Sequence, residues 1–323
     1  PSSQIACSTG GNIAENSGGV HCLKYGLTTN NIQGLEMVLM DGQVMRLGGR
    51  HLDQSGYDLL GVATGSEGLL GVITEVTVRI LQKPETARAL LLGFPSNKSA
   101  GNCVAAIIGA GIIPGGMEMM DKPAIHATED FVHAGYPLDV QALLIVELDG
   151  PEVEVDHLIE RVDAIARQAG ATHLSVSRSE EERQAFWSGR KNAFPAVGRL
   201  SPDYLCMDGT IPRNRLPEVL KRMRELSEHH GLRVANVFHA GDGNLHPNLI
   251  YTGDTVPDEI WAAAGELFRA ALALGGTLTG EHGVGTLKRR WLEEELGTPQ
   301  LDLQRRIKEV FDPLGIMNPE KVF

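Results

Sequence analysis

Residues 141–170, QALLIVELDGPEVEVDHLIERVDAIARQAG, contain the pattern that decides the fold. The apolar run QALLIVEL is typical of a buried strand. Beyond it, Val155, Leu158 and Ile159 begin an apolar repeat with three- and four-residue spacing, and Gly170 ends the repeat. This stretch therefore predicts a buried strand followed by an amphipathic helix.

The same order occurs on both sides of this stretch. ALLLGF (89–94) precedes a helical pattern through CVAAIIGAG (103–111), and LCMDGTI (205–211) precedes LPEVLKRMRELSEHHG (216–231). Repeated strands and helices of this kind predict an α+β domain, an antiparallel sheet with helices on one face. The final segment, 301–323, reads as an amphipathic helix that is broken at Asp312-Pro313 and followed by an extended tail.

The first 82 residues have a different character, because they are rich in glycine and contain short β-type runs. The pair Asp41-Gly42 between two such runs predicts a hairpin, and the alternation through VITEVTVRI (72–80) predicts a strand with one buried face. Lys83-Pro84 marks a boundary. We therefore expect one domain at 1–82, a second at 83–295 and a C-terminal helix and tail at 296–323.

Composition limits the classes of function. The 323 residues are 42% hydrophobic and 22% charged, which excludes disorder, and the longest apolar run is too short to span a bilayer. A net charge of −12 repels phosphate backbones and argues against nucleic acid as a partner. The four cysteines form no CxxC pair, and we expect packed thiols in a reducing compartment.

The segment RVANVFHAGDGNLHPNLIY (233–251) carries the most chemical information. A two-residue turn at Asp242-Gly243 would place His239 directly opposite His246, with Asn248 on the same face. Facing histidines on neighbouring strands can reach one metal ion. A hydrogen-bonded histidine pair in an ordinary hairpin is the alternative reading.

A third metal ligand is offered by TGEHGVG (279–285), where Glu281 and His282 stand between glycines. Two imidazoles and one carboxylate form a catalytic type of metal site with open positions. In WSGRKNAF (187–194), the guanidinium of Arg190 could hold a carboxylate through two hydrogen bonds, although a solvated surface charge is the default interpretation, because most charges are exposed.

Two small-residue loops, TGGNIAENSGG (9–19) and TGSEGLLGVIT (64–74), could lie along a flat or phosphate-bearing cofactor. Neither loop is a GxGxxG fingerprint or a GxxxxGK phosphate loop, and turn glycines would also explain them.

These loops, together with FHAGDGNLHPN (238–248), TGEHGVG and NPEK (318–321), resemble the flavin-linked oxidases of the vanillyl-alcohol oxidase fold, in the branch that oxidises D-2-hydroxy acids. The resemblance covers essentially the whole chain. It implies the second half of an FAD-binding domain, a cap domain that supplies the substrate site, and a tail that returns to the flavin. The positions it implies against FAD are Gly10, Gly11, Asn12, Asn16, Gly65, Glu67, Gly71, Val72, Ile73 and Asn318.

The resemblance also implies roles at the reacting centre. His239, His246 and Glu281 match a divalent metal site, which could hold Zn, Mn or Fe, while Arg190 and Asn248 match positions that hold the substrate carboxylate. His282 would accept the hydroxyl proton while a hydride passes to the flavin.

Two departures from the family pattern matter. The pyrophosphate-binding half of the FAD domain is not found in these 323 residues, so we expect them to bind metal without flavin when they are isolated. No lysine stands near Leu205 and Cys206 to hold a distal carboxylate, which favours a short substrate such as glycolate or D-lactate.

The resemblance further implies partner subunits with a second flavin and iron–sulfur clusters, in the cytoplasm or attached to the inner membrane through those partners. No membrane-spanning segment is expected in the chain itself. Two other classes remain open: a metal-dependent hydrolase, because two histidines and a glutamate around zinc also activate water, and a non-catalytic fragment.

Overall fold

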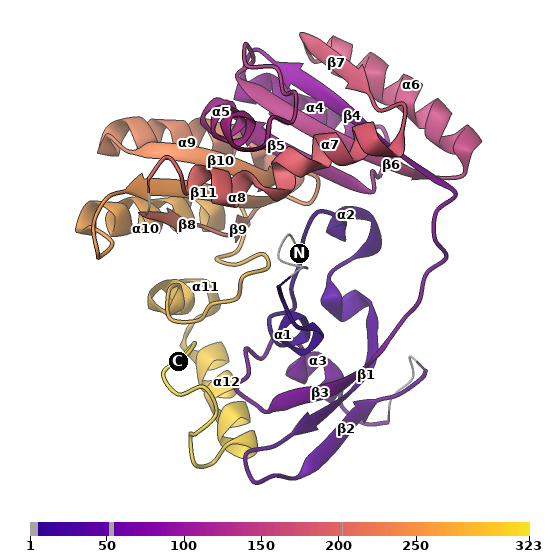
Figure 1. Ribbon diagram of the computed structural model, residues 1–323. Helices are drawn as coiled ribbons and strands as arrows, with labels where there is room; N and C mark the ends of the chain where they lie inside the picture. The colour runs from indigo at the N-terminus through magenta and orange to yellow at the C-terminus, as the bar shows by residue number, and fades with distance from the viewer. Residues whose placement is uncertain (1–5, 52–54, 202) are drawn as a thin grey trace. The chain divides into compact units, whose positions relative to one another are not determined.

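The computed structural model describes residues 6–51, 55–201 and 203–323, and the chain divides into two compact units (Figure 1). Unit 1 comprises residues 1–19, 25–82 and 278–323, whereas unit 2 comprises 20–24 and 83–277.

Unit 2 is built on an eight-stranded sheet, counted over the described residues, in which every pair of neighbouring strands is antiparallel. The order is β7-β4-β6-β5-β10-β11-β8, and β9 also pairs with β11, at Asn244 and Leu245. The strands are β4 (Thr86–Phe94), β5 (Gly116–Asp121), β6 (Ala142–Gly150), β7 (His173–Val176), β8 (Asp203–Cys206), β9 (Gly209–Thr210), β10 (Arg233–His239) and β11 (Asn244–Tyr251). The predicted α+β class and antiparallel sheet are confirmed.

Helices cover both faces of this sheet, which goes beyond the single covered face expected from the sequence (Figure 1). Alternation along β4 explains the two layers, because Leu90 and Leu92 face one core and Leu91 faces the other. The first core is closed by α4 (Asn97–Gly109), α6 (Glu152–Gln168), α9 (Leu216–His230) and α10 (Asp258–Ala273). The second core is closed by α5 (Lys122–Val132), α7 (Glu180–Lys191) and α8 (Ala193–Val197), and the short η2 (Arg213–Arg215) leads into α9.

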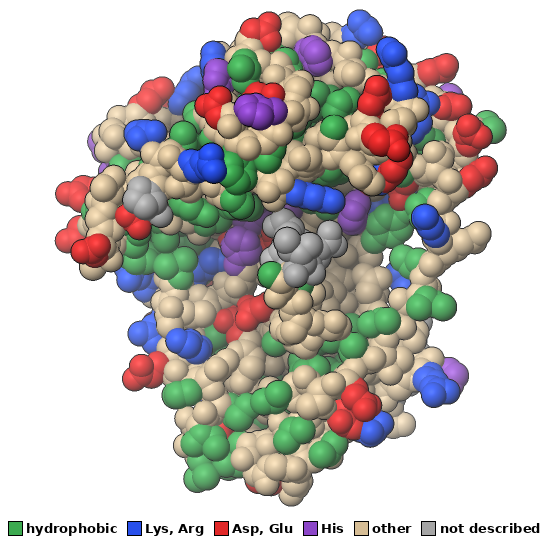
Figure 2. All heavy atoms as spheres, in the orientation of Figure 1, with side chains coloured by type: hydrophobic (Ala, Val, Ile, Leu, Met, Phe, Trp, Pro, Cys, Tyr) green, Lys and Arg blue, Asp and Glu red, His purple; other side chains and the backbone are tan. Residues whose placement is uncertain are grey.

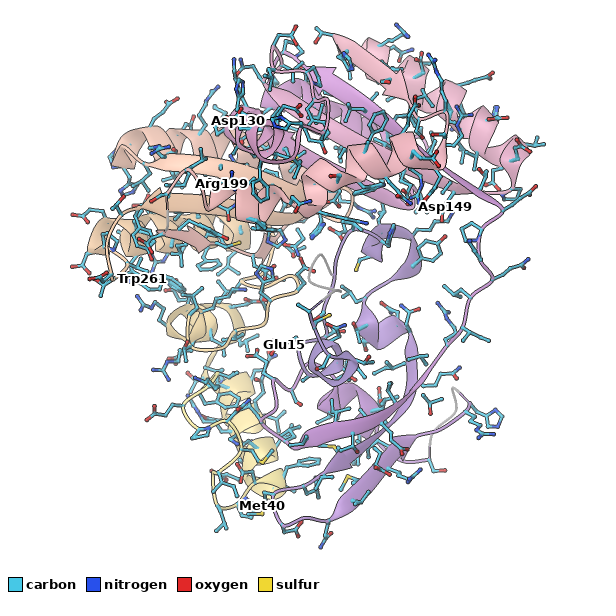
Figure 3. The ribbon with its side chains drawn as sticks, viewed as in Figure 1. Glu15, Met40, Asp130, Asp149, Arg199 and Trp261 are labelled. Atoms are coloured by element: carbon cyan, nitrogen blue, oxygen red, sulfur yellow. The ribbon has the colours of Figure 1, made fainter. Side chains whose placement is uncertain are left out.

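A five-residue segment from near the N-terminus, Val20–Lys24, completes unit 2. Lys24 donates hydrogen bonds of 2.6 Å to both the backbone oxygen and the carboxylate of Asp149, which is labelled in Figure 3. Leu23 packs so closely on Gly241 that a β-carbon built there would lie 2.6 Å from Leu23 Cδ2. The strands of unit 2 are therefore capped by residues that lie far away in the sequence.

Unit 1 contains a three-stranded antiparallel sheet of order β2-β1-β3 among the described residues. Its hydrophobic core includes side chains from β1, α3, α11 and α12. The elements are α1 (Thr9–Ala14), η1 (Thr28–Asn30), β1 (Ile32–Val38), β2 (Val44–Gly48), α3 (Leu59–Ala63), β3 (Val72–Val78), η3 (Arg289–Trp291), α11 (Leu292–Leu296) and α12 (Thr298–Phe311), with α2 (Cys22–Tyr25) at the boundary between the units. The predicted hairpin at Asp41-Gly42 is confirmed as β1-β2.

Three local expectations in unit 1 were wrong. Residues Thr9–Ala14 form a helix instead of a loop, because the Ser8 hydroxyl accepts a hydrogen bond from Gly11 N and caps it. β3 has no single buried face, since an irregular register opposite Glu36/Met37 interrupts the alternation, so that Ile73 and Val76 both reach the core. The tail after Pro313 is a series of turns, held where Asp312 accepts from Ile316 N and Met317 N.

All four cysteines are free thiols. Acidic and basic side chains are interspersed on the face shown in Figure 2. Within the described ranges, every helix is too short or too polar to cross a bilayer.

Candidate active site

The two histidines of the predicted metal site lie on one face of unit 2, but they are not directly opposite each other. β10 and β11 pair so that His239 faces Asn244 and Val237 faces His246. The register is thus shifted by two residues from the prediction, and an even shift keeps both imidazoles on the same face. Their ring centroids are 5.1 Å apart and their planes are nearly perpendicular.

The conformation of the turn explains this correction. A two-residue type I′ turn needs positive φ at both central residues, but among Asp242 and Gly243 only Gly243, at φ 85°, has it. Gly243 N instead donates to His239 O over 3.1 Å, which closes a four-residue loop. Contacts from outside the hairpin fix this loop, because Ile211 N donates to Gly243 O and Gly241 N donates to Met117 O.

Each of these histidines uses Nδ1 in a hydrogen bond to an oxygen. His239 Nδ1 donates to Glu118 Oε1 over 2.9 Å, and His246 Nδ1 donates to the backbone oxygen of Met207 over 3.1 Å. With the proton on Nδ1, the lone pair of each ring is on Nε2. Metal-binding histidines show this arrangement, in which the second nitrogen is held by a carboxylate or a carbonyl. The pair places ligand nitrogens within 4.8 Å of each other.

Arg190, at the end of α7, is buried and not a surface charge. Its Nε donates to Glu118 Oε2 over 2.7 Å, and both side chains are only 1% exposed. Burial alone would raise the pKa of Glu118, but the neighbouring His239 and Arg190, which both donate hydrogen bonds to the carboxylate, outweigh burial and lower this pKa. Arg190 Nη1 is buried and has no hydrogen-bond partner among the described residues.

Asn248 is completely buried on the same face. Its Nδ2 donates to the backbone oxygens of Ala235 and His246, both at 3.0 Å, so the orientation of the amide is fixed. Oδ1 is buried without a partner in the described part of the chain. Asn248 therefore presents a hydrogen-bond acceptor, which suits a hydroxyl group better than the carboxylate expected from the sequence.

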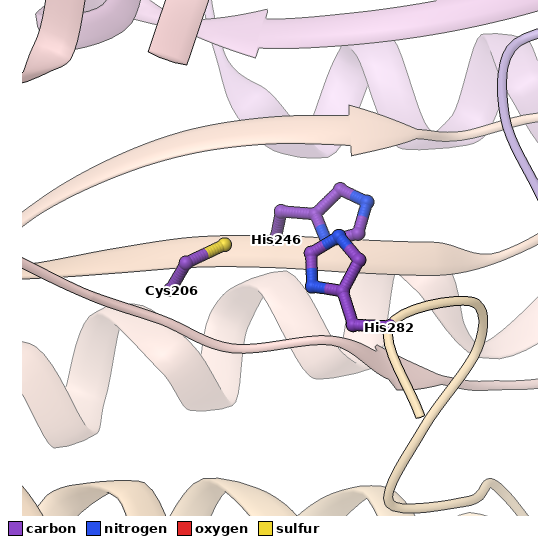
Figure 4. Close-up of side chains that lie close together, drawn as sticks. All are labelled: Cys206, His246 and His282. Carbon is purple, nitrogen blue, oxygen red and sulfur yellow. The ribbon is translucent and has the colours of Figure 1, made fainter. Parts of the chain in front are cut away.

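Cys206, on β8, pairs across the sheet with Asn248 and lies beside His246 (Figure 4). Its sulfur is within 4.8 Å of a ring nitrogen of His246. The ring of Phe194 packs edge-on against His246 at 5.8 Å between centroids. A thiol and an aromatic ring thus border the histidine pair.

In unit 1, Glu67 and Asn318 lie in contact. The two carboxylate oxygens of Glu67 accept hydrogen bonds from Val284 N and Gly285 N at 2.6 and 2.7 Å, and Asn318 Nδ2 donates to Glu67 O over 2.6 Å. Glu67 and Asn318 both have left-handed backbone, at φ 52° and 44°. These two cofactor candidates therefore fasten the loop at 64–71 to the segment at 284–285 and to the tail.

The remaining cofactor candidates occupy different surroundings. A β-carbon on Gly10 would lie 3.0 Å from Ile73 O, and one on Gly71 would lie 2.9 Å from Val38 O, so backbone atoms leave little room for a side chain at either position. Asn16 Oδ1 accepts from Thr29 N over 2.9 Å. Gly11 and Asn12 lie in α1, and Val72 is exposed on β3.

A cavity of about 530 Å³ lies within unit 1, a volume typical of ligand sites. Asn16, Gly65 and Glu67 line it, together with apolar residues such as Leu69 and Leu70. Glu15 also lines it, and burial, followed by the nearby charge of Glu67, raises the pKa of Glu15 to about 7 despite Lys288. Backbone polar groups and apolar side chains in one cavity are compatible with a flat ring system.

Glu281 and His282 belong to unit 1, where a β-carbon on Gly18 would touch Glu281 at 3.0 Å. The structure thus brings together His239, His246, Arg190 and Asn248 in unit 2, and Glu67 with Asn318 in unit 1. Glu118 escaped the sequence analysis, although a charged residue inside the methionine-rich strand GMEMMD (116–121) was a signal.

Comparison with known proteins supports the fold and the class. Residues 83–322 match the family described as FAD linked oxidases, C-terminal domain, and residues 1–48 match an FAD binding domain. The 4-ethylphenol oxidase from Gulosibacter chungangensis superimposes with a TM-score of 0.74 at 18% identity, over 97% of this chain and 69% of that one. The fold is therefore that of the vanillyl-alcohol oxidase class of flavoproteins.

Curated relatives are closer in sequence. The chain is 52% identical to the glycolate oxidase subunit GlcD of Escherichia coli strain K12, over 99% of this chain and 65% of that protein. It is 33% identical to a D-lactate dehydrogenase of Archaeoglobus fulgidus, over 97% of this chain and 69% of that protein. The chain belongs to the FAD-linked oxidase family, and it spans about 65% of the length of the Escherichia coli relative.

Proposed function

We propose that this chain is part of an FAD-dependent enzyme that oxidises a short D-2-hydroxy acid, glycolate or D-lactate, to the 2-oxo acid. The observation that carries the proposal is the buried pair His239 and His246, each anchored through Nδ1, beside the buried guanidinium of Arg190 in a member of this family. Residues 1–82 would form the flavin part, 83–295 the cap and 296–323 the returning tail.

The metal proposal adds Glu281 to the two histidines. Thr277 is tied to unit 2, because Thr210 N donates to Thr277 O and Thr277 N to Thr210 O. Glu281 follows four residues later, so the chain lets it reach no more than about 14 Å from Thr277. Two imidazoles and a carboxylate suit Zn, Mn or Fe, and such an ion would supply a Lewis acid for the substrate hydroxyl.

The residues of the chain would orient the substrate. Arg190 Nη1 would donate one hydrogen bond to the substrate carboxylate, because Nε is already held by Glu118. Asn248 Oδ1 would accept from the α-hydroxyl, and His282 would take the hydroxyl proton. FAD, when bound, supplies the acceptor for the hydride.

The uncharged side chains beside the histidine pair support a short substrate. Cys206 and Phe194 carry no charge that could pair with a second carboxylate. The two relatives, a glycolate oxidase subunit and a D-lactate dehydrogenase, are named for short hydroxy acids. Discrimination against D-2-hydroxyglutarate follows from the cost of leaving its distal carboxylate unpaired.

Cofactor and partner proposals follow from the same family. Asn16, Gly65, Glu67 and Asn318 would contribute to the FAD site, together with Gly10, Gly11, Asn12, Gly71, Val72 and Ile73. We infer from the word subunit in the name of the Escherichia coli relative that further subunits accept the electrons, in the cytoplasm or at the inner membrane.

The test uses this chain extended at its N-terminus by the corresponding residues of the Escherichia coli relative. We expect a visible flavin absorption band that bleaches with glycolate or D-lactate but not with D-2-hydroxyglutarate. His239→Ala and His246→Ala should each abolish stoichiometric metal and the bleaching. Metal-dependent hydrolysis without any flavin band would instead support the hydrolase alternative and overturn the proposal.

A further inference from the structure

We propose that Glu118 is a positioning residue, which holds His239 in the Nδ1–H tautomer and fixes the direction of Arg190. None of the roles assigned so far uses this carboxylate, although it contacts one proposed metal ligand and the proposed substrate-binding guanidinium at once. Its effect on metal binding rests on the proposed function, whereas its effect on the tautomer does not.

The sheet itself puts Glu118 in this place. β5 and β10 are antiparallel, with Met120 facing Val237 and Met119 facing Phe238. The next pair in that register is Glu118 and His239, on the same side as the core that contains Met120 and Val237. The contact is therefore set by strand pairing and does not depend on the conformation of a loop.

Glu118 contacts two donors. His239 Nδ1 lies 2.9 Å from both of its oxygens, and Oε2 also accepts from Arg190 Nε over 2.7 Å. Because both partners donate, a carboxylate suits the position between them: it accepts at both oxygens, whereas a glutamine amide accepts at one oxygen and turns a donor to the other side. The pairing also supplies the opposite charge that a buried guanidinium requires.

These hydrogen bonds set the tautomer of His239 and the orientation of the Arg190 guanidinium. A proton held on Nδ1 puts the lone pair of His239 on Nε2, the nitrogen that would bind a metal ion in the proposed function. A hydrogen bond at Nε fixes the guanidinium plane, so that the buried Nη1 remains as the donor for an anion.

Glu147 provides a matched control. It is also buried, lies on neighbouring β6 and belongs to the same face, but its carboxylate accepts from Arg183 and Trp187, while His21 Nδ1 lies 3.9 Å away and bonds to Gly115 O. Glu118→Gln and Glu147→Gln therefore remove the same charge at similar depth, and only the first replaces an acceptor oxygen beside His239 Nδ1 with an amide donor.

The experiment has two readouts on the 323-residue chain. Long-range ¹H–¹⁵N NMR of the metal-free protein, assigned with His239→Gln, reports which ring nitrogen of His239 carries the proton. We expect Nδ1–H in the unsubstituted chain and in Glu147→Gln, and a mixture of tautomers in Glu118→Gln. Zinc affinity, measured by competition with a chelator, should fall about 10–100-fold in Glu118→Gln and less than threefold in Glu147→Gln.

Two results would overturn the inference: an Nε2–H tautomer of His239 in the unsubstituted chain, or a Glu118→Gln variant that keeps both the tautomer and the zinc affinity. If the unsubstituted chain bound no divalent ion at all, the metal proposal would fail, and the NMR measurement would still decide the role of Glu118. The same measurement on the unsubstituted chain decides it if Glu118→Gln does not fold.

Discussion

Arg190 is a buried cation that pairs with Glu118 and, in the proposed function, would also hold the substrate carboxylate. Arg190→Lys keeps the charge but removes the planar group whose Nε reaches Glu118 while Nη1 stays available. We expect kcat/KM for glycolate in the N-terminally extended chain to fall by about tenfold or more, equivalent to about 1.4 kcal/mol. Arg183→Lys, on the same helix but paired with Glu147, should keep the parental value. Equal efficiency in Arg190→Lys would remove Arg190 from the substrate site.

Asp121 is a buried carboxyl group whose titration should affect stability. Burial raises its pKa to about 6, although hydrogen bonds from Asn236 and Ala124 act in the opposite direction. The unfolded chain releases this proton near pH 3.8, so the folded state binds it more tightly. The stability that this group contributes is therefore complete below pH 4 and lost as the pH rises through about 6. The loss amounts to about 3 kcal/mol, since each pKa unit corresponds to about 1.4 kcal/mol.

Asp121→Asn removes this titration and keeps an oxygen for the cap of α5. The amide of Asn236, whose Oδ1 is buried without a partner in the described chain, can turn to accept from the new amide. We expect the variant to gain stability over the parent between pH 4 and pH 8, measured as the free energy of unfolding in urea. A difference between the two proteins that does not vary with pH would contradict the assignment.

At the scale of the element, the hairpin β10-β11 depends on Gly243. A β-carbon there would lie 2.2 Å from Ile211 O, and φ is 85°. Gly231, at the end of α9, has a similar φ of 64° but no heavy atom within 4 Å of such a carbon. Gly231→Ala should cost about 1–2 kcal/mol through its backbone alone. Gly243→Ala should lower the free energy of unfolding in urea by more than this amount, and it should also weaken zinc binding, measured by competition with a chelator. If the two variants lost equal stability, the backbone around Ile211 would have to move aside at little cost.

The same hairpin shows what sequence can and cannot predict. The Asp-Gly pair correctly located the reversal, and two-residue periodicity correctly put His239 and His246 on one face. The loop length was wrong, because hydrogen bonds from Ile211 and to Met117, distant in the chain, select four residues over two. Glu118 was missed for the same reason: its partners are 72 and 121 positions away, and local patterns do not encode such pairings.

At the scale of the whole molecule, the link between β3 and β4 is an exposed crossing from unit 1 to unit 2. Ile80 and Leu81 are 89% and 50% exposed, and they lie in a stretch without helix or strand. We expect thermolysin, which cuts before bulky apolar residues, to cleave first at these two positions, as shown by the masses of the fragments. Ile80→Ser with Leu81→Ser should slow this cut. A first cut inside 83–277 would contradict the division of the chain.

The segment Val20–Lys24 has a consequence for anyone who recombines these proteins. A chimera joined at Gln82/Lys83 would take the sheet of unit 2 from one parent and the five residues that cap it from another. The five residues from the other parent would then need a lysine that pairs with Asp149 and a leucine that packs against Gly241, in the loop between β10 and β11. The exchangeable module is therefore discontinuous, and a swap of substrate preference between relatives should transplant residues 20–24 along with 83–277.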